Sequence, residues 1–335
     1  MSDLKQEIIA IAREHGIDKV GFTSRERLAA APPSGDLTYV LPSARSAVSL
    51  VVALDHTVTR AYLAKEDQVG HSHDQGRAYA KLKEAAHAIQ RLLVDKGHEV
   101  HCPQANFQYR KDLPPMTMAP PLSHRYVAVA SGLGWIGWSG NVFTPEYGAA
   151  VCISSVVTSA ELGPDPMLAG EPPCKSCRLC AAVCPSYFIS RNDETSVSIG
   201  GRDHSYHRKV TNMRCLVTCG GANGARAGAE WSTWSHRVLD LPGRGEDEAF
   251  QRKVFEYRQR PNSRLLNFLL DMEQTGVADG DWDEYDRRSF EMTFSCSYCM
   301  LICWPSMEDR RKNYRMVVTS GKVFKDQTGL KVVRA

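Results

Sequence analysis

The pattern of apolar and polar residues divides the first half of the chain into short helices and strands. Apolar residues recur at helical spacing over residues 3–15, 77–96 and 126–131. Other stretches are apolar and β-branched over the length of a single strand. These predicted strands are residues 19–23, 47–53, 98–102 and 149–158. The mixture predicts an α/β or α+β fold in which helices pack against a sheet.

The pattern changes near residue 165. Residues 161–173 hold four prolines and two glycines, a composition typical of a linker. Beyond them, nine of the eleven cysteines lie between Cys174 and Cys303. We therefore expect one domain over residues 1–165, a cysteine-rich domain over 166–310, and a C-terminal tail over 311–335.

The composition is that of a globular protein, with 43% hydrophobic and 24% charged residues. The formal net charge of +3 shows no basic surplus of the kind that nucleic-acid binders carry, so we expect no nucleic-acid partner. No apolar run approaches the about 20 residues of a membrane span. The N-terminus lacks the basic and apolar segments of an export signal. We therefore expect a cytoplasmic protein without a membrane partner.

Eleven cysteines in a reducing compartment indicate metal or cluster ligation rather than disulfides. The first run, C-x2-C-x2-C-x3-C-P, consists of Cys174, Cys177, Cys180 and Cys184 followed by proline. It matches the bacterial ferredoxin run, in which the fourth cysteine ligates the second of two [4Fe–4S] clusters. Zinc is the alternative ion for paired C-x2-C units, but a zinc site does not require the proline. Unliganded buried thiols would not produce such regular spacing.

A second run, C-x2-C-x3-C, lies near the end of the chain and is one ligand short. We assign one [4Fe–4S] cluster to Cys174, Cys177, Cys180 and Cys303. The other takes Cys184, Cys296, Cys299 and one of two cysteines between the runs, Cys215 or Cys219, of which we favour Cys215.

The remaining cysteines, Cys102 and Cys152, each stand alone on a predicted strand. We interpret them as small buried apolar residues.

A glycine-rich loop, Gly132-Leu-Gly-Trp-Ile-Gly137, follows a predicted helix. It fails as a dinucleotide-binding fingerprint, which follows a strand and has an acidic residue about 20 positions later. Together with Thr144–Gly148 and the two cysteine runs, the loop resembles the cobalamin-dependent iron–sulfur reductases. That family includes epoxyqueuosine reductases and reductive dehalogenases. The resemblance covers residues 3–306.

The resemblance implies a nitroreductase-like domain that binds cobalamin, followed by a ferredoxin-like domain whose two [4Fe–4S] clusters supply electrons to cobalt. The residues that would contact the cofactor are Tyr79, Gly132, Leu133, Gly134, Trp135, Gly137 and Tyr147. The candidates for proton donation or for stabilising an anion over cobalt are Tyr109, His124 and Arg125. An external ferredoxin or flavodoxin would donate the electrons, and a small organic molecule would be the substrate.

The histidines offer no cobalt ligand on this interpretation. The D-x-H-x-x-G motif of histidine ligation is absent, and residues 71–76, the nearest match, have histidine in place of its aspartate. We therefore expect base-off cobalamin without a histidine ligand. We interpret His71 and His73 as part of a solvated loop.

The chain departs from epoxyqueuosine reductases at positions tied to their substrate. The aspartate proposed as their proton donor is missing from residues 116–121, and Trp138 replaces the lysine that follows their glycine loop. These departures count against epoxyqueuosine as the substrate. Residues 144–148 and 184–186 resemble the dehalogenase branch instead, which implies reductive dehalogenation or deoxygenation of a small organic substrate. Two alternatives stay open: a non-catalytic cobalamin-binding protein for electron transfer or cofactor handling, and an iron–sulfur oxidoreductase with flavin in place of cobalamin.

Overall fold

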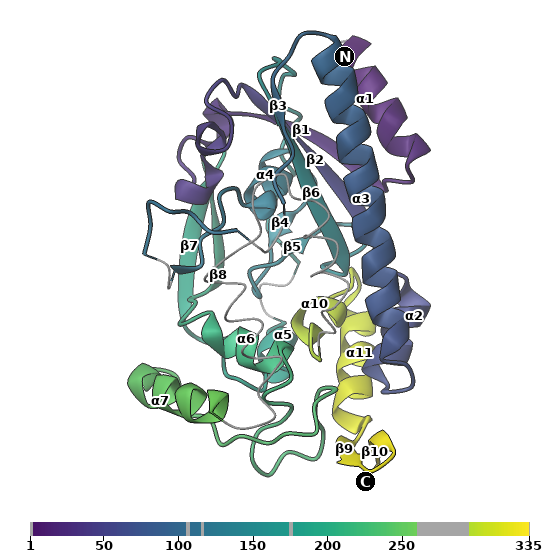
Figure 1. Cartoon of the computed structure of the whole chain (residues 1–335), viewed down its shortest axis with the longest axis vertical. Coiled ribbons are helices and arrows are strands. Elements are labelled where there is room, and N and C mark those ends of the chain that lie inside the picture. Colours follow the sequence, from purple (N-terminus) through teal and green to yellow (C-terminus); the bar gives the residue numbers. More distant parts are fainter. Residues whose placement is uncertain (1–2, 105–107, 115–116, 174–176, 260–294, 335) are drawn as a thin grey trace.

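Figure 1 shows the computed structural model of the chain, which describes residues 3–104, 108–114, 117–173, 177–259 and 295–334. The helices are α1 (Asp3–Glu14), α2 (His56–Leu63), α3 (Val69–Asp95), α4 (His124–Ala130), α5 (Leu179–Ala182), α6 (Met213–Cys219), α7 (Asp247–Arg258), α10 (Tyr298–Leu301) and α11 (Met307–Thr319). The strands are β1 (Lys19–Ser24), β2 (Ser46–Ala53), β3 (Val100–His101), β4 (Trp135–Ile136), β5 (Val142–Phe143), β6 (Val151–Thr158), β7 (Glu194–Ile199), β8 (Arg202–His207), β9 (Lys322–Asp326) and β10 (Gly329–Val333).

The centre of the fold is a four-stranded antiparallel sheet with the order β1-β2-β6-β3. Strand β2 pairs with β6 along its whole length, with Val48 opposite Val156 and Val51 opposite Ile153. All but the last residue of β2 is buried, as expected for an apolar strand covered on both faces. The predicted mixture of helices and strands is therefore confirmed.

The two faces of the sheet pack against different helices. Alternate residues of β2, including Val48 and Leu50, belong to the core formed with α1 and α3. Ala47 and Val157 on the other face belong to a core with α4. Figure 1 shows the long helix α3 along one side of the sheet. A residue of the sheet therefore contacts either α1 and α3 or α4, depending on the face that its side chain occupies.

Helix α3 begins earlier than the sequence predicts, at Val69 rather than Arg77. His71 therefore lies on this helix and is only 1% exposed, with its ring 4.5 Å from that of Tyr62. The interpretation of His71 as a loop residue in solvent is wrong, because packing of α3 against α2 extends the helix through Gly70 and Gly76. His73 is exposed, but it also lies on the helix.

The end of the chain also differs from expectation. From residue 311 on, where a tail was expected, the chain continues α11 and forms the β9–β10 hairpin. Val317 and Val323 are buried in the same core as α1 and α3.

Residues from both sides of position 165 share the main core. Tyr62 donates a hydrogen bond from its hydroxyl to the carbonyl oxygen of Cys296 at 2.8 Å, and Trp234 Nε1 donates to the carbonyl oxygen of Tyr62 at 3.0 Å. The rings of His56 and Trp304 stack 3.7 Å apart. Helix α2 therefore holds the cysteine-containing segments against the sheet layer, while the domain division at residue 165 stays a prediction.

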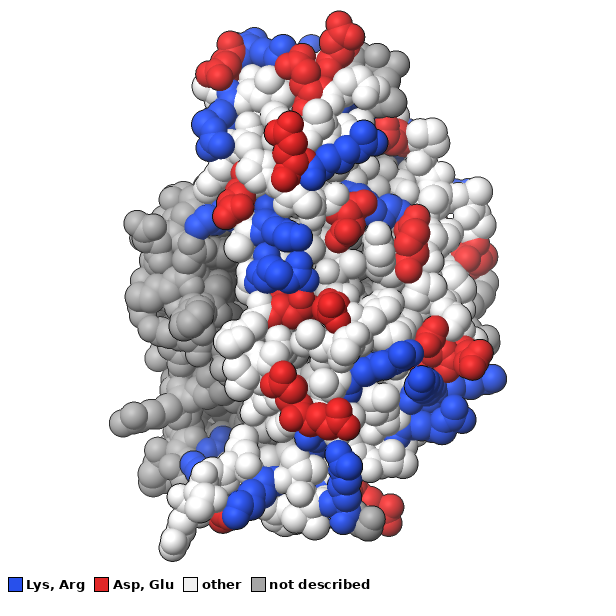
Figure 2. All heavy atoms as spheres, turned by 90° about the vertical axis from the view of Figure 1, so that its right-hand side faces the viewer, with Lys and Arg blue, Asp and Glu red and all other residues white. Residues whose placement is uncertain are grey.

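Charges of both signs are interspersed over the face that Figure 2 shows, which includes the side of α3. In the described part of the chain, no helix combines the length and apolar character that a membrane span needs.

Candidate functional site

The first group of cysteines faces one pocket. Cys177, Cys180 and Cys303 line it together with Trp138 and Arg310. Their fourth predicted partner, Cys174, lies outside the described residues. The structure therefore brings together the three described members of this set from segments more than a hundred residues apart.

The C-x2-C units that start at Cys177 and Cys296 share one backbone feature. Arg178, after Cys177, and Ser297, after Cys296, both adopt left-handed conformations, with φ of 51° and 76°. Each starts a single-turn helix, α5 or α10, and these two helices are in contact. A positive φ in a side-chain-bearing residue is uncommon and marks a constrained turn.

A second group contains five thiols: Cys184, Cys215, Cys219, Cys296 and Cys299. Cys215 and Cys219 are one turn apart on α6, with their Sγ atoms 3.7 Å apart. Cys219 also hydrogen-bonds with Cys296, and Cys215 interacts electrostatically with Cys184 and Cys299. Both candidates for the eighth ligand therefore lie in this group, so the choice between them remains open.

In the second group Cys296 is buried, and the other four cysteines are half-buried. Burial raises the pKa of Cys184, and it raises the pKa of Cys299 to about 12. Thiolates in such surroundings need positive charge, which iron supplies in a cluster. Within the described ranges, no three Cys, His, Asp or Glu side chains are grouped in a way that would hold a single metal ion.

The glycine loop ends beside this second group. The backbone N–H of Gly137 donates to the carbonyl oxygen of Asn141 at 2.8 Å, which closes a tight turn. Asn141 Nδ2 in turn donates to Cys299 Sγ at 3.7 Å. The loop and the second group are therefore neighbours, although they are far apart in sequence.

The glycines of the loop are required by contacts within the protein. A Cβ atom on Gly132 would lie 2.2 Å from the carbonyl oxygen of Pro166, and one on Gly134 would lie 2.5 Å from that of Phe143. Gly132 also has a φ of +75°. Close packing of β4, β5 and residue 166 thus explains the two glycines.

The other residues assigned to cofactor contacts lie on different faces of the sheet. Leu133 and Tyr147 share a small apolar cluster with Val51. Trp135 lies next to Phe143, with ring centroids 6.5 Å apart. Tyr79 is on α3 and packs on the opposite face of the sheet. The structure brings Leu133 and Tyr147 together but separates both from Tyr79.

The three candidate catalytic residues have different environments. His124 is 8% exposed, and its Nδ1 lies 2.9 Å from Ser155 Oγ on β6. Burial lowers the pKa of His124 to about 4, so its ring is neutral near pH 7. The next residue, Arg125, is half-buried and donates from Nη1 to the carbonyl oxygen of Gly140 at 2.8 Å. Tyr109 is half-buried in the segment 108–114.

Cys102 and Cys152 are 8% and 3% exposed, and both belong to the main core. Burial raises the pKa of each thiol to about 12. Their interpretation as buried apolar residues is confirmed.

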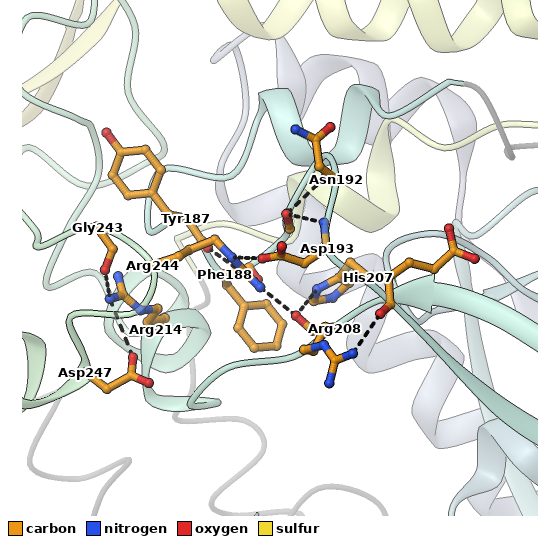
Figure 3. A network of polar contacts seen from close by, with 12 residues as sticks. Tyr187, Phe188, Asn192, Asp193, His207, Arg208, Arg214, Gly243, Arg244 and Asp247 are labelled. Atoms are coloured by element: carbon orange, nitrogen blue, oxygen red, sulfur yellow. Dashed lines mark hydrogen bonds and ion pairs between the residues drawn. The ribbon is translucent and has the colours of Figure 1, made fainter.

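Two arginines hold the segment that follows the first cysteine run (Figure 3). Arg244 donates to the carbonyl oxygens of Tyr187, Phe188 and Arg208 and forms an ion pair with Asp193 at 3.0 Å. Arg214, which is fully buried, lies directly before Cys215. Its donors reach the carbonyl oxygens of Ser186, Pro242 and Gly243. These contacts fix the positions of Cys184 and Cys215 relative to each other.

Sequence reasoning missed several residues of this site. Arg244 and Asn141 lie in no recognisable motif, because their contacts are with residues that are distant in sequence and close only in the folded chain. Trp138, which follows the glycine loop in sequence, lines the pocket of the first cysteine group. Arg178 covers its ring there, and its Nε1 donates to the carbonyl oxygen of Ser190 at 2.7 Å.

No family model matches the chain. Among curated proteins, the epoxyqueuosine reductase of Bacillus cereus is 25% identical over 211 residues, which cover 55% of this chain and 51% of that protein. The epoxyqueuosine reductase of Atelocyanobacterium thalassa is 38% identical over 69 residues, 21% of this chain and 22% of that protein. The chain thus spans about half the length of the first of these relatives.

Solved structures give weaker matches. An epoxyqueuosine reductase in complex with a tRNA stem loop has a TM-score of 0.44 at 18% identity, covering 97% of this chain and 82% of that one. A catabolic reductive dehalogenase has a TM-score of 0.49 at 14% identity, covering 97% of this chain and 39% of that one. At these TM-scores the structural likeness is weak, and the sequence matches define the relationship.

That epoxyqueuosine reductase was solved with nucleic acid bound. For the present chain, the absence of a nucleic-acid partner stays a prediction from its net charge. In sequence the present chain is a relative of the epoxyqueuosine reductases, which confirms the resemblance that its glycine loop and cysteine runs predict.

Proposed function

We propose that the chain is an iron–sulfur oxidoreductase that holds two [4Fe–4S] clusters and passes electrons to cobalamin for the reduction of a small organic substrate. The observation that carries the proposal is the sorting of its cysteines into two groups. One is the pocket of Cys177, Cys180 and Cys303, and the other is the set of thiols around Cys215 and Cys299. Four thiolates for each of two clusters match the ligand requirement of bacterial ferredoxins.

Cobalamin enters the proposal from the resemblance. The adjacency of the glycine loop and the second cysteine group supports it, because a cofactor held at the loop would lie near a cluster. When bound, cobalamin would supply the reductive chemistry at its cobalt. The chain would provide the apolar contacts of Leu133 and Tyr147 and the charge of Arg125.

Among the three candidate catalytic residues, the surroundings favour Arg125. Its guanidinium group stays protonated at all relevant pH values, so it would stabilise an anion rather than donate a proton. Tyr109 remains our proposed proton donor. His124 fits a packing role instead, because its ring is buried between α4 and β6.

Electrons would enter from an external low-potential donor of the ferredoxin or flavodoxin type. A cavity of about 290 Å³ lies beside the second cysteine group, lined by residues that include Ala182, Pro185 and Trp231. Since Ala182 and Pro185 flank Cys184 closely in sequence, this cavity is our proposed point of entry.

The test is a measurement of iron, sulfide, cobalt and flavin in protein purified without oxygen after expression with added cobalamin. About eight irons and one cobalt per chain would support the whole proposal. Eight irons with flavin and no cobalt would replace cobalamin by flavin. Zinc in place of iron would contradict the proposal altogether. A loaded protein that reduces no halogenated or epoxide substrate would favour the non-catalytic alternative.

A further inference from the structure

Two cationic side chains from distant parts of the chain meet beside Gly140. A Cβ atom built on Gly140 would lie 3.6 Å from Lys209 Cε and 3.9 Å from Arg125 Nη1. Arg125 is in the first turn of α4, whereas Lys209 follows β8. The fold therefore brings two positive charges to one point, which is unfavourable unless a negative charge is also present.

Neither cation has an acidic partner among the residues that the structure describes. Arg125 uses one N–H group for the carbonyl oxygen of Gly140, and its remaining donors are available. Lys209 forms no hydrogen bond or ion pair with another described residue. Although much of its side chain reaches solvent, the surrounding protein and then Arg125 lower the pKa of Lys209 to about 7.

A third polar side chain faces the same point. Tyr206 on β8 places its Cδ2 atom 3.6 Å from the Cβ position, and Arg125 interacts electrostatically with its phenol group. Because Gly140 has no side chain, its Cβ position is left unfilled, and the side-chain atoms around it are Lys209 Cε, Tyr206 Cδ2 and Arg125 Nη1 at van der Waals distance. A guanidinium, an ammonium and a hydroxyl group are the donors that proteins use to bind carboxylate and phosphate.

The position is next to the second cysteine group. Cys215 interacts electrostatically with both Arg125 and Lys209, and Cys299 interacts with Arg125. An anion held here would lie close to the cluster that we propose for that group.

We propose that Arg125, Lys209 and Tyr206 form a binding site for the anionic group of the substrate, a carboxylate or a phosphate, beside the second cysteine group. The inference rests on the proposed function, since it names the substrate class of the same reductase. Arg125 and Lys209 would neutralise the anion, and Tyr206 would donate a hydrogen bond to it.

The experiment is calorimetric titration of the anaerobically purified protein with benzoate and with inorganic phosphate, using benzamide as the uncharged counterpart of benzoate. The wild-type protein is expected to bind at least one anion and not benzamide, and the tighter anion identifies carboxylate or phosphate as the group recognised. Lys209→Gln is expected to weaken anion binding about 10-fold or more, since it removes a charge-assisted contact. Lys209→Arg is expected to retain it.

The matched control is Lys312→Gln, which removes an exposed charge on α11 and is expected to leave binding unchanged. The proposal is overturned if benzamide binds as well as benzoate, or if Lys209→Gln leaves anion affinity intact. It is also overturned if the substitution changes only the midpoint potential of a cluster, since the two cations would then serve the cluster alone. Iron and cobalt content is measured on the same samples. It tests the proposed function independently of the anion site, so the two proposals can fail separately.

Discussion

The sheet layer and the cysteine region of this protein are stabilised in different ways. The sheet layer, β1, β2, β6 and β3 with α1 and α3, is held by long apolar stretches that pack on both faces of β2. The cysteine region, residues 177–219 and 295–303, has helices of four to seven residues. Such short helices gain little from their own hydrogen bonds. Arginine contacts to carbonyl oxygens hold this region in place, and its cysteines converge from distant segments.

This difference suggests that metal binding and folding are coupled in one region and not in the other. Enclosed thiolates repel one another unless iron compensates their charge. The sheet layer has no such requirement, because its contacts are apolar. Substitutions in the cysteine region should therefore remove clusters and local order together, while the sheet layer persists.

The largest effect is expected for Cys303→Ser, which removes a proposed cluster ligand from the first group. Iron content should fall from about eight to about four per chain. Hydrogen exchange should show lost protection in α5 and α10 and retained protection in β2 and β6. Cys152→Ala, which removes a buried thiol of the sheet layer, is the control and should keep all the iron. Equal loss of protection in both regions would show that they fold as one unit.

The next comparison is between the two neighbouring cysteines of α6. We expect Cys215→Ala to lose the second cluster, and with it about four irons, because Cys215 interacts with both Cys184 and Cys299. Cys219→Ala should keep about eight irons. The reverse outcome would identify Cys219 as the ligand. Retention of all the iron in both variants would show that each thiol can replace the other.

A smaller effect is expected for Arg244→Gln, which tests the arginine contacts without removing a ligand. Arg244 is 17% exposed and links three carbonyl oxygens to Asp193. Its loss should lower the free energy of unfolding by about 2–4 kcal/mol, measured by denaturant titration, because several charge-assisted hydrogen bonds disappear. Arg252→Gln, on the exposed face of α7, is the control and should change stability by less than about 0.5 kcal/mol.

Much of the sheet layer could be predicted from the sequence because its signals are local. The run at 47–53 and the helical spacing at 77–96 each predict an element that the structure contains, β2 and α3. The extension of α3 to Val69 could not be predicted, since two glycines interrupt the pattern and only packing against α2 overrides them.

The site could be predicted where the ligand spacing is itself a motif. The ferredoxin run identifies Cys177, Cys180 and Cys184 directly as predicted cluster ligands. No sequence motif predicts that Arg125, Gly140 and Lys209 are neighbours. They come from three segments, α4, a turn and the end of β8, that are close only in the folded chain. For the same reason the sequence does not reveal that Tyr79 and Leu133 lie on opposite faces of the sheet.

The smallest effect concerns a polar residue inside the sheet layer itself. His71 is 1% exposed, and neither ring nitrogen has a hydrogen-bond partner among the described residues. Burial lowers the pKa of His71 to about 4 in the folded protein, below the about 6.5 of an unfolded chain. The unfolded state then binds more protons between these values, so stability is lost as the pH falls from about 6.5 toward 4. His71→Met should reduce that loss by roughly 1–3 kcal/mol, measured as the free energy of unfolding at pH 7 and at pH 4.5. His124, whose pKa is lowered equally, remains in both proteins, so part of the acid sensitivity should persist. An unchanged pH dependence would mean that His71 contributes nothing and that other groups, such as His124, account for the stability lost in acid.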